Sequence, residues 1–198
     1  EKVAQSIKIM GIKHAVITSV DRDDLKDMGS ILWAETVQAI RRLNPNTTLE
    51  TLIPDFQGIH KHLDRIVAVA PEVISHNMET VKRLTRAVRI QARYERSLEV
   101  LRYLKEAGAN RTKTGLMLGL GETREEVIET LHDLRAHEVD VVTLGQYLQP
   151  SKKHLPVVEY ITPEQFKEYE TIGLELGFRH VESGALVRSS YKAQKHIL

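Results

Sequence analysis

The stretch RTKTGLMLGLGETREEVIETLHDLRAHEVDVVTLG (residues 111–145) contains one complete unit of the pattern that decides the fold. Its two apolar, β-branched runs, Thr112–Met117 and Asp140–Gly145, predict two strands. Between them, Thr123 and Glu126 have the spacing of a capping box, which begins a helix. The apolar positions of that helix recur every three or four residues, at Val127, Leu131 and Leu134. A strand, a helix and a second strand of these lengths indicate a parallel βαβ unit.

The same alternation runs along the whole chain. Four further strands are predicted, at His14–Ser19, Thr48–Leu52, Val73–His76 and Arg179–Glu182. Successive strands begin roughly 25–40 residues apart, which is the spacing of βα units. Further helices are predicted at Glu1–Met10, after a cap at Ser30, and from Thr162-Pro163 to Gly177. We therefore expect one α/β domain over residues 1–198, its parallel sheet forming a barrel, a partial barrel or a doubly wound fold.

The composition argues against several classes of protein. Lys+Arg 28 against Asp+Glu 27 leave a net charge of +1, which gives no electrostatic support for binding nucleic acid or an anionic membrane. No apolar run approaches the length of a membrane span and no signal peptide opens the chain, so we expect a cytosolic protein. Because cysteine is absent, this sequence alone cannot build disulfides or thiolate-held iron–sulfur sites.

The length and the first residue predict a truncated barrel. The 198 residues are few for a complete (β/α)8 barrel, which has about 250. The sequence also begins at Glu1, inside a predicted helix and without an initiator Met. We expect the truncation to lie at the N-terminal side.

Polar side chains follow every one of the first five strands. These strand ends are Thr18–Leu25, Glu50–Phe56, Ser75–Thr80, Leu118–Thr123 and Leu144–Ser151. The carboxyl ends of parallel strands meet at one edge of the sheet, where α/β enzymes carry their chemistry. Five consecutive polar strand ends therefore predict an active site at the mouth of a barrel.

Each motif also has a purely structural interpretation. Asp21, Asp23 and Asp24 are typical of a turn or a helix cap. The run Gly119-Leu120-Gly121 lacks the last glycine of a dinucleotide fingerprint and the lysine of a P-loop, so a tight turn is favoured. His76, beside a buried strand, is typical of a hydrogen-bonded core histidine. It is the convergence of the strand ends that favours a functional site.

Six motifs, in this order and spacing, resemble those of the lipoyl synthases, a family of radical SAM enzymes. They are TSVDRDDL (18–25), ETLIPDF (50–56), HNMETV (76–81), MLGLGE (117–122), GQYLQPS (145–151) and RSSYKA (188–193). The likeness covers essentially all 198 residues and implies a partial parallel (β/α)6-type radical-SAM barrel. Met28 departs from the family, which usually has a second glycine there; a turn with positive φ would strain it.

The resemblance implies a sulfurtransferase. Lipoyl synthases insert two sulfur atoms, at C6 and C8, into an octanoyl group bound to a carrier protein. The carriers implied are the lipoyl domains of 2-oxoacid dehydrogenase E2 subunits and the glycine-cleavage H protein, with ferredoxin or flavodoxin as reductant. The protein would be cytoplasmic, or mitochondrial in a eukaryote.

The family's cofactors are two [4Fe–4S] clusters and S-adenosylmethionine (SAM). The cluster cysteines of the family lie upstream of the region that this sequence matches, so the resemblance implies that the stretch is inactive without them. A serine of the family's Arg-Ser-Ser-Tyr motif is an oxygen ligand of the auxiliary cluster, and it corresponds to Ser189 or Ser190. Arg188 would position this motif by pairing with a carboxylate at the rim.

The resemblance and the strand-end positions together suggest which residues bind SAM. The candidates are Thr18, Ser19, Asn77, Glu79, Lys113 and Gln146. Thr18 and Ser19 would hold the methionyl amino group, and Asn77 and Glu79 would bond the ribose or amino groups. Lys113 and Gln146 would reach SAM or the octanoyl chain.

Two other functions remain open from the residues. One is a cofactor-free or Mg²⁺-dependent barrel lyase that uses Glu50, Asp55 and Glu122 as ligands or as an acid–base pair. The other is a degenerate barrel that binds acylated carrier domains without catalysis. Turnover or metal binding without a cluster would favour the first, and carrier binding without radical chemistry would favour the second.

Overall fold

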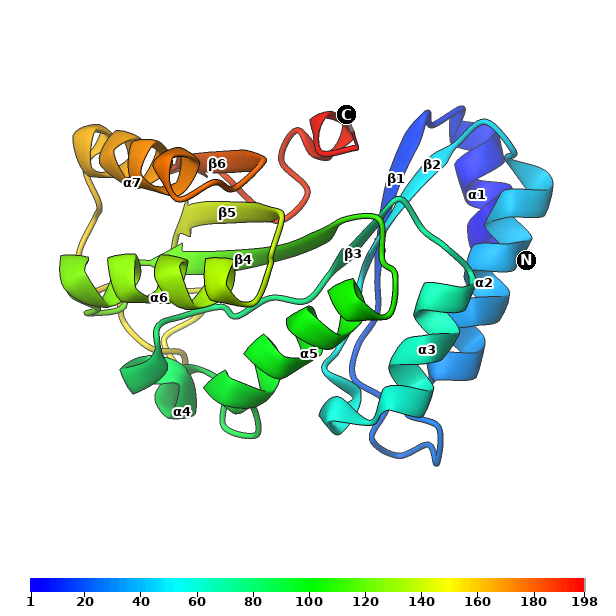
Figure 1. Ribbon diagram of the computed structural model, residues 1–198, viewed down its shortest axis with the longest axis horizontal. Helices are drawn as coiled ribbons and strands as arrows, with labels where there is room; N and C mark the ends of the chain where they lie inside the picture. Colours follow the sequence, from blue (N-terminus) through cyan, green and yellow to red (C-terminus); the bar gives the residue numbers. More distant parts are fainter. Residues whose placement is uncertain (198) are drawn as a thin grey trace.

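Six parallel strands form one sheet in the computed structural model, which describes residues 1–197. The strands are β1 (His14–Thr18), β2 (Thr48–Leu52), β3 (Val73–Ser75), β4 (Thr112–Leu118), β5 (Val141–Gln146) and β6 (His180–Gly184). Each pairs with the next strand along the chain, so β1 and β6 are the two edges (Figure 1). All six strands were predicted from the sequence to within two residues at either end.

Helices cover the outer face of this curved sheet (Figure 1). The α-helices are α1 (Lys2–Met10), α2 (Ser30–Leu43), α3 (His60–Ala68), α4 (Thr85–Val88), α5 (Tyr94–Glu106), α6 (Arg124–Ala136) and α7 (Pro163–Glu175). The 3-10 helices are η1 (Phe56–Gly58), η2 (Lys82–Leu84) and η3 (Ala193–Lys195). The concave face instead encloses the C-terminal segment, so the sheet is a partial barrel rather than a doubly wound fold. Among residues 1–197, no helix is long and apolar enough to cross a membrane.

Local sequence signals account for the boundaries of three helices, α1, α6 and α7. Thr123 caps α6 through a reciprocal capping box with Glu126, as predicted, and Thr162 caps α7 in the same way. Gly11 ends α1 in the left-handed conformation with φ 62°. Met28 has φ 52°, so the turn that the sequence suggested as strained does adopt a left-handed backbone.

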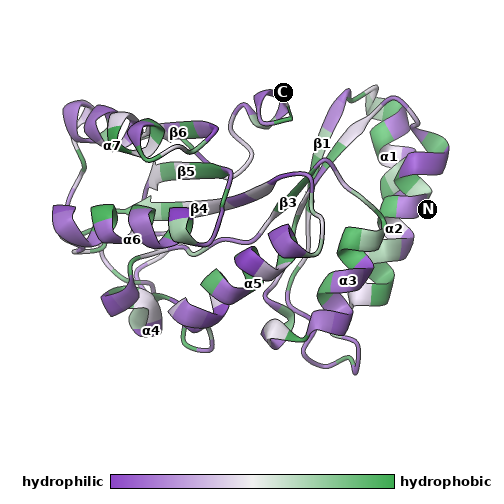
Figure 2. Cartoon of the chain, viewed as in Figure 1, coloured by the Kyte–Doolittle hydropathy of each residue, from purple (hydrophilic) through white to green (hydrophobic). Residues whose placement is uncertain are grey.

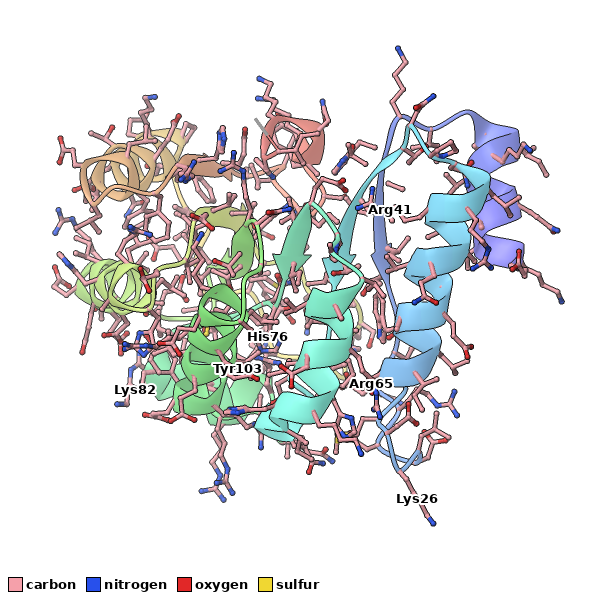
Figure 3. All side chains as sticks on the ribbon, turned by 45° about the vertical axis from the view of Figure 1, so that its right-hand side comes forward. Lys26, Arg41, Arg65, His76, Lys82 and Tyr103 are labelled. Carbon is pink, nitrogen blue, oxygen red and sulfur yellow. The ribbon has the colours of Figure 1, made fainter. Side chains whose placement is uncertain are left out.

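The predicted cap at Ser30 is wrong. Gly29 is the N-cap residue of α2, and the carboxylate of Asp27 accepts from the backbone N–H of Ile31 at 2.8 Å. The Ser30 hydroxyl is buried between α2 and α3, where Arg65 Nη1 donates to it at 2.8 Å (Figure 3). A capping oxygen must point back at the free N–H groups of the first turn, and this one points into a side-chain contact.

Apolar packing fixes the helices to the sheet. Figure 2 shows hydrophobic and hydrophilic residues alternating along the helices, as expected where one face of each helix is buried. The core side of α6 contributes Val127, Leu131 and Leu134, the three positions predicted, each no more than 1% exposed. They pack with Leu116 and Leu144 from β4 and β5. The rigid outer layer thereby holds the carboxyl ends of the strands at one rim.

The C-terminal segment, residues 185–197, returns between the two edge strands (Figure 1). Its 3-10 helix η3 packs against β1 at the far edge of the sheet from β6. Ala193 and His196 are buried there. The segment therefore occupies the inside of the partial barrel and brings residues 188–190 to the strand ends.

A polar cleft at the carboxyl ends of the strands

Two adjoining hollows lie at the carboxyl ends of the strands, and Asn77 and Glu79 line both of them. One has a volume of about 210 Å³ and extends to Thr18 and Ser19 after β1. The other, of about 140 Å³, extends across β4 and β5 to the C-terminal segment, and its polar lining includes Gln146, Arg188 and Ser189. Most of the predicted site residues therefore meet in one continuous cleft. The convergence of strand ends expected from the sequence is confirmed for β1, β3 and β5.

Asn77 is the centre of this cleft. Its side-chain amide donates to Glu79 Oε1 at 3.0 Å and to the Ser189 hydroxyl at 3.1 Å, although Ser189 lies 112 residues away in the sequence. Its backbone carbonyl accepts from Arg89 Nη1 at 2.9 Å. Because both its side chain and its backbone are held, the Asn77 amide has a fixed orientation.

Glu79 adopts a left-handed backbone with φ 67°, which is uncommon for a residue other than glycine. Two hydrogen bonds hold this conformation, from Glu79 N–H to the carbonyl of Gly115 and from Met117 N–H to the carbonyl of Glu79. The conformation turns the carboxylate into the cleft. Burial raises the pKa of Glu79, while the hydrogen bond from Asn77 and the charge of Arg89 oppose that rise.

Gly115 leaves the room that Asn77 needs. A Cβ atom at position 115 would lie 2.9 Å from the Thr143 hydroxyl and 3.0 Å from Asn77 Oδ1, closer than normal contacts. Because glycine has no Cβ atom, position 115 on β4 leaves space for the Asn77 amide, which extends over the strand toward Ser189.

Thr18 and Ser19 lie on the opposite side of the cleft, where β1 ends. The Thr18 hydroxyl donates to the Leu52 carbonyl at 3.2 Å, and both side chains are exposed. They also line a larger hollow of about 490 Å³, which runs along β1 between α1 and α2. That hollow is mostly apolar, so the hollow of about 210 Å³, which Thr18 and Ser19 share with Asn77 and Glu79, is the better candidate for a charged metabolite.

Lys113 lies away from the rim. It is the second residue of β4, it is 1% exposed, and it lines neither hollow of the cleft. Its ammonium donates to both carboxylate oxygens of Glu50, at 2.8 and 2.9 Å, and to the backbone carbonyl of Ser189 at 2.5 Å. Burial lowers the pKa of Lys113, and the carboxylate of Glu50 opposes that shift. Its contact with the cleft is through Ser189.

Gln146 faces the cleft but its amide is already engaged. Its Nε2 donates to the carbonyl of Glu159 at 3.0 Å, and its Oε1 accepts from Ile161 N–H at 2.9 Å. The side chain thus joins the end of β5 to the far end of the loop 147–162. It shapes one wall of the hollow by holding this loop.

The C-terminal motif enters the cleft with Ser189, while Ser190 is exposed beside it. The expected pairing of Arg188 with a rim carboxylate is not what the structure has. Arg188 Nη1 donates to the carbonyls of Val187 at 2.6 Å and Ala185 at 3.4 Å, so the guanidinium braces its own turn. A bond from Arg188 to a carbonyl of its own turn needs no second segment of the chain to be ordered, whereas a bond to a rim carboxylate would. The local bond is therefore favoured.

The carboxylates of the lyase hypothesis have other partners. Glu50 is bound to Lys113, and Asp55 accepts from Arg96 Nε at 2.7 Å. Glu122 accepts from the N–H groups of the turn Gly119-Leu120, the tight turn that the sequence predicted. Within residues 1–197, no group of three or more His, Cys, Asp or Glu is arranged to hold a metal ion. The three carboxylates therefore stabilise three different parts of the barrel.

His76 is the core histidine that the sequence predicted, enclosed between the sheet and α5 (Figure 3). Nδ1 contacts the Ile53 carbonyl at 3.1 Å and Nε2 contacts the Ser97 hydroxyl at 2.9 Å. The first contact requires a proton on Nδ1, so Nε2 accepts from Ser97. Burial, together with the charge of Arg89, lowers the pKa of His76 to about 4.

Sequence reasoning missed Arg89 and the partner of Lys113. Arg89 is one of several basic residues in the stretch 82–96, and the sequence gives no sign that it reaches the Asn77 carbonyl. A signal did exist for the buried pair, because Glu50 and Lys113 are opposite charges inside apolar strands. Such residues are almost never fully buried unless they are paired.

The cleft suits SAM better than it suits a cluster. Both donors of the Asn77 amide are engaged, so Asn77 and Glu79 present acceptor oxygens beside the two hollows, which suit the amino and hydroxyl groups of a ligand. An iron–sulfur cluster needs thiolates, and the sequence contains no cysteine. The residues present therefore do not by themselves form a cluster site.

Comparison with known sequences places this cleft in context. Residues 1–134 match the family model described as the Radical SAM superfamily. The chain is 80% identical over 197 residues to the mitochondrial lipoyl synthase of Nematostella vectensis, a match that covers 100% of this chain and 68% of that protein. It is 79% identical over 198 residues to the lipoyl synthase of Flavobacterium johnsoniae, covering 100% of this chain and 69% of that protein.

Solved structures share the fold at much lower identity. A maturase of the [FeFe]-hydrogenase superposes with a TM-score of 0.70 at 12% identity, covering 99% of this chain and 54% of that one. Methylornithine synthase superposes with a TM-score of 0.67 at 15% identity, covering 93% and 60%. At these identities the likeness establishes the arrangement of strands and helices, and the architecture of a radical SAM partial barrel is confirmed.

Proposed function

Because the chain belongs to the radical SAM superfamily and, within it, to the lipoyl synthases, we propose that its cleft inserts sulfur into a carrier-bound octanoyl group. The reaction adds one sulfur atom at C6 and one at C8, which makes the enzyme a sulfurtransferase. The observation that carries this proposal is the identity of 80% to a lipoyl synthase over 100% of the chain.

We propose that SAM binds across the two hollows, against Asn77 and Glu79. These two side chains line both hollows. Arg89 holds the backbone of Asn77, the bonds to β4 hold the backbone of Glu79, and the Asn77 amide bonds the Glu79 carboxylate. Thr18 and Ser19 would contact SAM from the β1 side. Gln146 would act by holding the wall of the cleft, and Lys113 would act through Ser189, since their polar groups are already engaged.

Membership of the superfamily implies a [4Fe–4S] cluster and SAM as cofactors. When bound, the cluster supplies the electron that cleaves SAM; the sequence supplies no cysteine to hold it. We further propose a second, auxiliary cluster, with an oxygen ligand from Ser189 or Ser190. Ser189 faces the cleft and Ser190 lies exposed next to it, so either hydroxyl is at the correct end of the barrel.

The partners and the compartment are also proposals. The substrates would be octanoylated lipoyl domains of 2-oxoacid dehydrogenase E2 subunits and the glycine-cleavage H protein, with ferredoxin or flavodoxin as the electron donor. We place the enzyme in the cytoplasm, or in mitochondria if the source is a eukaryote. The mitochondrial description of the Nematostella vectensis relative supports the second possibility.

A chimera tests this function. The 198 residues would replace the matching stretch of the Flavobacterium johnsoniae lipoyl synthase, so that the rest of that protein supplies whatever this sequence lacks. The chimera and the unmodified relative would be reconstituted anaerobically and given SAM and an octanoylated lipoyl domain. Mass spectrometry of the lipoyl domain should show two sulfur atoms added by both proteins. A chimera that folds and holds its clusters but adds no sulfur would overturn the proposal.

The same chimera tests the SAM contacts. Asn77→Ala and Glu79→Gln should each weaken SAM binding, measured by equilibrium dialysis independently of turnover. The matched control is Glu99→Gln, an exposed residue on the outer helix α5. Unchanged SAM affinity in both cleft variants would show that Asn77 and Glu79 do not contact SAM. The proposal of sulfur insertion would still be decided by its own assay.

A further inference from the structure

Lys113 and Glu50 form a buried ion pair inside the partial barrel. Lys113 and Glu50 are 1% and 0% exposed, and the three donors of the ammonium all have acceptors. Two of these acceptors are the carboxylate oxygens of Glu50, and the third is the backbone carbonyl of Ser189. Ser75 completes the group by donating its hydroxyl to Glu50 Oε1 at 2.6 Å. The cluster therefore joins β2, β3 and β4 to the C-terminal segment.

The contact with Ser189 is the unusual part of this arrangement. A lysine buried only to bridge strands would need no acceptor beyond the sheet, and desolvating an ammonium is costly. Here the third hydrogen bond leaves the sheet and reaches a segment with few other polar anchors. The Asn77 amide donates to the hydroxyl of the same serine at 3.1 Å. Ser189 is therefore held by two hydrogen bonds, one from Lys113 to its carbonyl and one from Asn77 to its side chain.

We propose that Lys113 is a positioning residue, whose ammonium, oriented by Glu50, fixes the Ser189 carbonyl and so sets the direction of the serine pair 189–190 at the cleft. Fixing one peptide unit restricts the backbone torsions on both sides of it, and these torsions decide where the two hydroxyls point. The consequence for catalysis rests on the proposed function. The positioning itself can be tested without any cofactor.

Two variants separate positioning from ordinary stabilisation. Lys113→Met alone leaves Glu50 as a buried charge without its partner, and the fold should lose much of its stability. The double variant Glu50→Gln/Lys113→Met removes both charges and keeps an acceptor for Ser75, so its stability should recover. Methionine has no donor, so both variants lose the hydrogen bond from residue 113 to the Ser189 carbonyl. If Lys113 positions the motif, the double variant will be stable and its C-terminal segment will be loose.

The absence of cysteine makes the segment easy to observe. Ser190 is exposed, so Ser190→Cys introduces one thiol that carries a nitroxide spin label at a unique position. A label on Ile9→Cys, at an 86% exposed position of α1, reports on a distant part of the fold. Lys105→Met is the matched control, because Lys105 pairs with Asp140 at 2.7 Å and neither residue bonds the C-terminal segment.

Electron paramagnetic resonance of the label and urea unfolding would be measured on the same samples. We expect the label at 190 to be immobilised in the parent and in Lys105→Met, and to reorient several-fold faster in the stable double variant. The label at 9 should not change. An immobilised label at 190 in the double variant would show that Lys113 only neutralises Glu50, and would overturn the proposal. Because no step of this experiment uses SAM, a cluster or a carrier, its outcome is independent of the sulfur insertion assay.

Discussion

The backbone carbonyl of Val187 lies so close to Gly145 that a Cβ atom at position 145 would overlap the oxygen. Gly145 is on β5 and Val187 is on the C-terminal segment, three residues after β6. The backbone angle φ of Gly145 is not in the left-handed region, so the glycine is required by this close approach alone. The two backbones touch where the serine motif enters the cleft.

Gly145→Ala should therefore displace the C-terminal segment. An added methyl group that meets backbone cannot be accommodated by a side-chain rotation, and overpacking of this kind costs about 1–3 kcal/mol. The free energy of unfolding from urea titration should fall by that amount. The matched control is Gly184→Ala on β6, the register partner of Gly145, where the new Cβ would make an ordinary contact of 3.6 Å with Val187. Equal stability of the two variants would contradict the close approach.

Glu79→Gln should stabilise the protein at neutral pH. Burial raises the pKa of Glu79 above its ordinary value of 4.5, so the folded state binds this proton more tightly than the unfolded state does. The charged form therefore lowers stability progressively as pH rises from about 4.5 through the folded pKa. Urea midpoints of the variant and the parent should differ at pH 7.5 and converge near pH 4. The exposed Glu99→Gln serves as control, and a parent that equals Glu79→Gln at pH 7.5 would disprove the shift.

His76 should make the protein sensitive to acid. Its folded pKa of about 4 lies below the ordinary value of 6.5, because burial and the charges of Arg89 and Arg96 outweigh Asp55 and the Ile53 carbonyl. Below pH 6.5 the unfolded state takes up the proton first, so stability is lost as pH falls toward 4, by roughly 3 kcal/mol in full. His76→Gln should be less stable at pH 7.5 but should lose less between pH 7 and 4.5.

The control for this experiment is His132→Gln, an exposed residue of α6 that should leave the acid sensitivity unchanged. His196 is also buried, with its pKa lowered by burial to about 3, and it remains in both variants. Some acid sensitivity will therefore persist in His76→Gln. An identical pH profile of His76→Gln and the parent would show that His76 does not titrate in this range.

Local signals were enough to predict the six strands and the helices α1, α2, α6 and α7, whereas α3, α4 and α5 were not predicted. The strands are short runs of β-branched and apolar residues, and α6 and α7 begin at the caps Thr123 and Thr162, so these boundaries are encoded within a few residues. The helices α3 and α5 begin without a side-chain cap, and the sequence offers no such signal for them. At Ser30 the predicted cap was wrong, because Gly29 is the N-cap residue and the Asp27 carboxylate, not the Ser30 hydroxyl, accepts from a backbone N–H of the first turn. Both residue types favour caps, and only the backbone of the preceding turn decides between them.

Contacts between distant segments were not predictable in the same way. Alternating strands and helices indicate a parallel sheet, but its curvature depends on packing along the whole chain. The pairing of Glu50 with Lys113 joins residues 63 positions apart, and the bond of Asn77 to Ser189 joins residues 112 apart. The sequence located Asn77, Glu79 and Ser189 as candidates. It did not show that Arg188 would bond its own turn, because that choice depends on where the segment enters the barrel.

Gln146→Leu should loosen the loop 147–162 without unfolding the barrel. Leucine fills nearly the same volume but cannot donate to the Glu159 carbonyl or accept from Ile161 N–H, so both ends of the loop lose their shared anchor. Replacing buried hydrogen-bonding groups in this way leaves their partners unsatisfied and costs about 1–3 kcal/mol. Limited proteolysis should then cut within residues 148–160 faster than in the parent. Gln149→Leu removes one exposed hydrogen bond to His154 in the same loop and is the matched control. If both variants are cut at the parent's rate, the loop is held by Tyr147, whose hydroxyl donates to the Leu155 carbonyl at 2.8 Å, and not by Gln146.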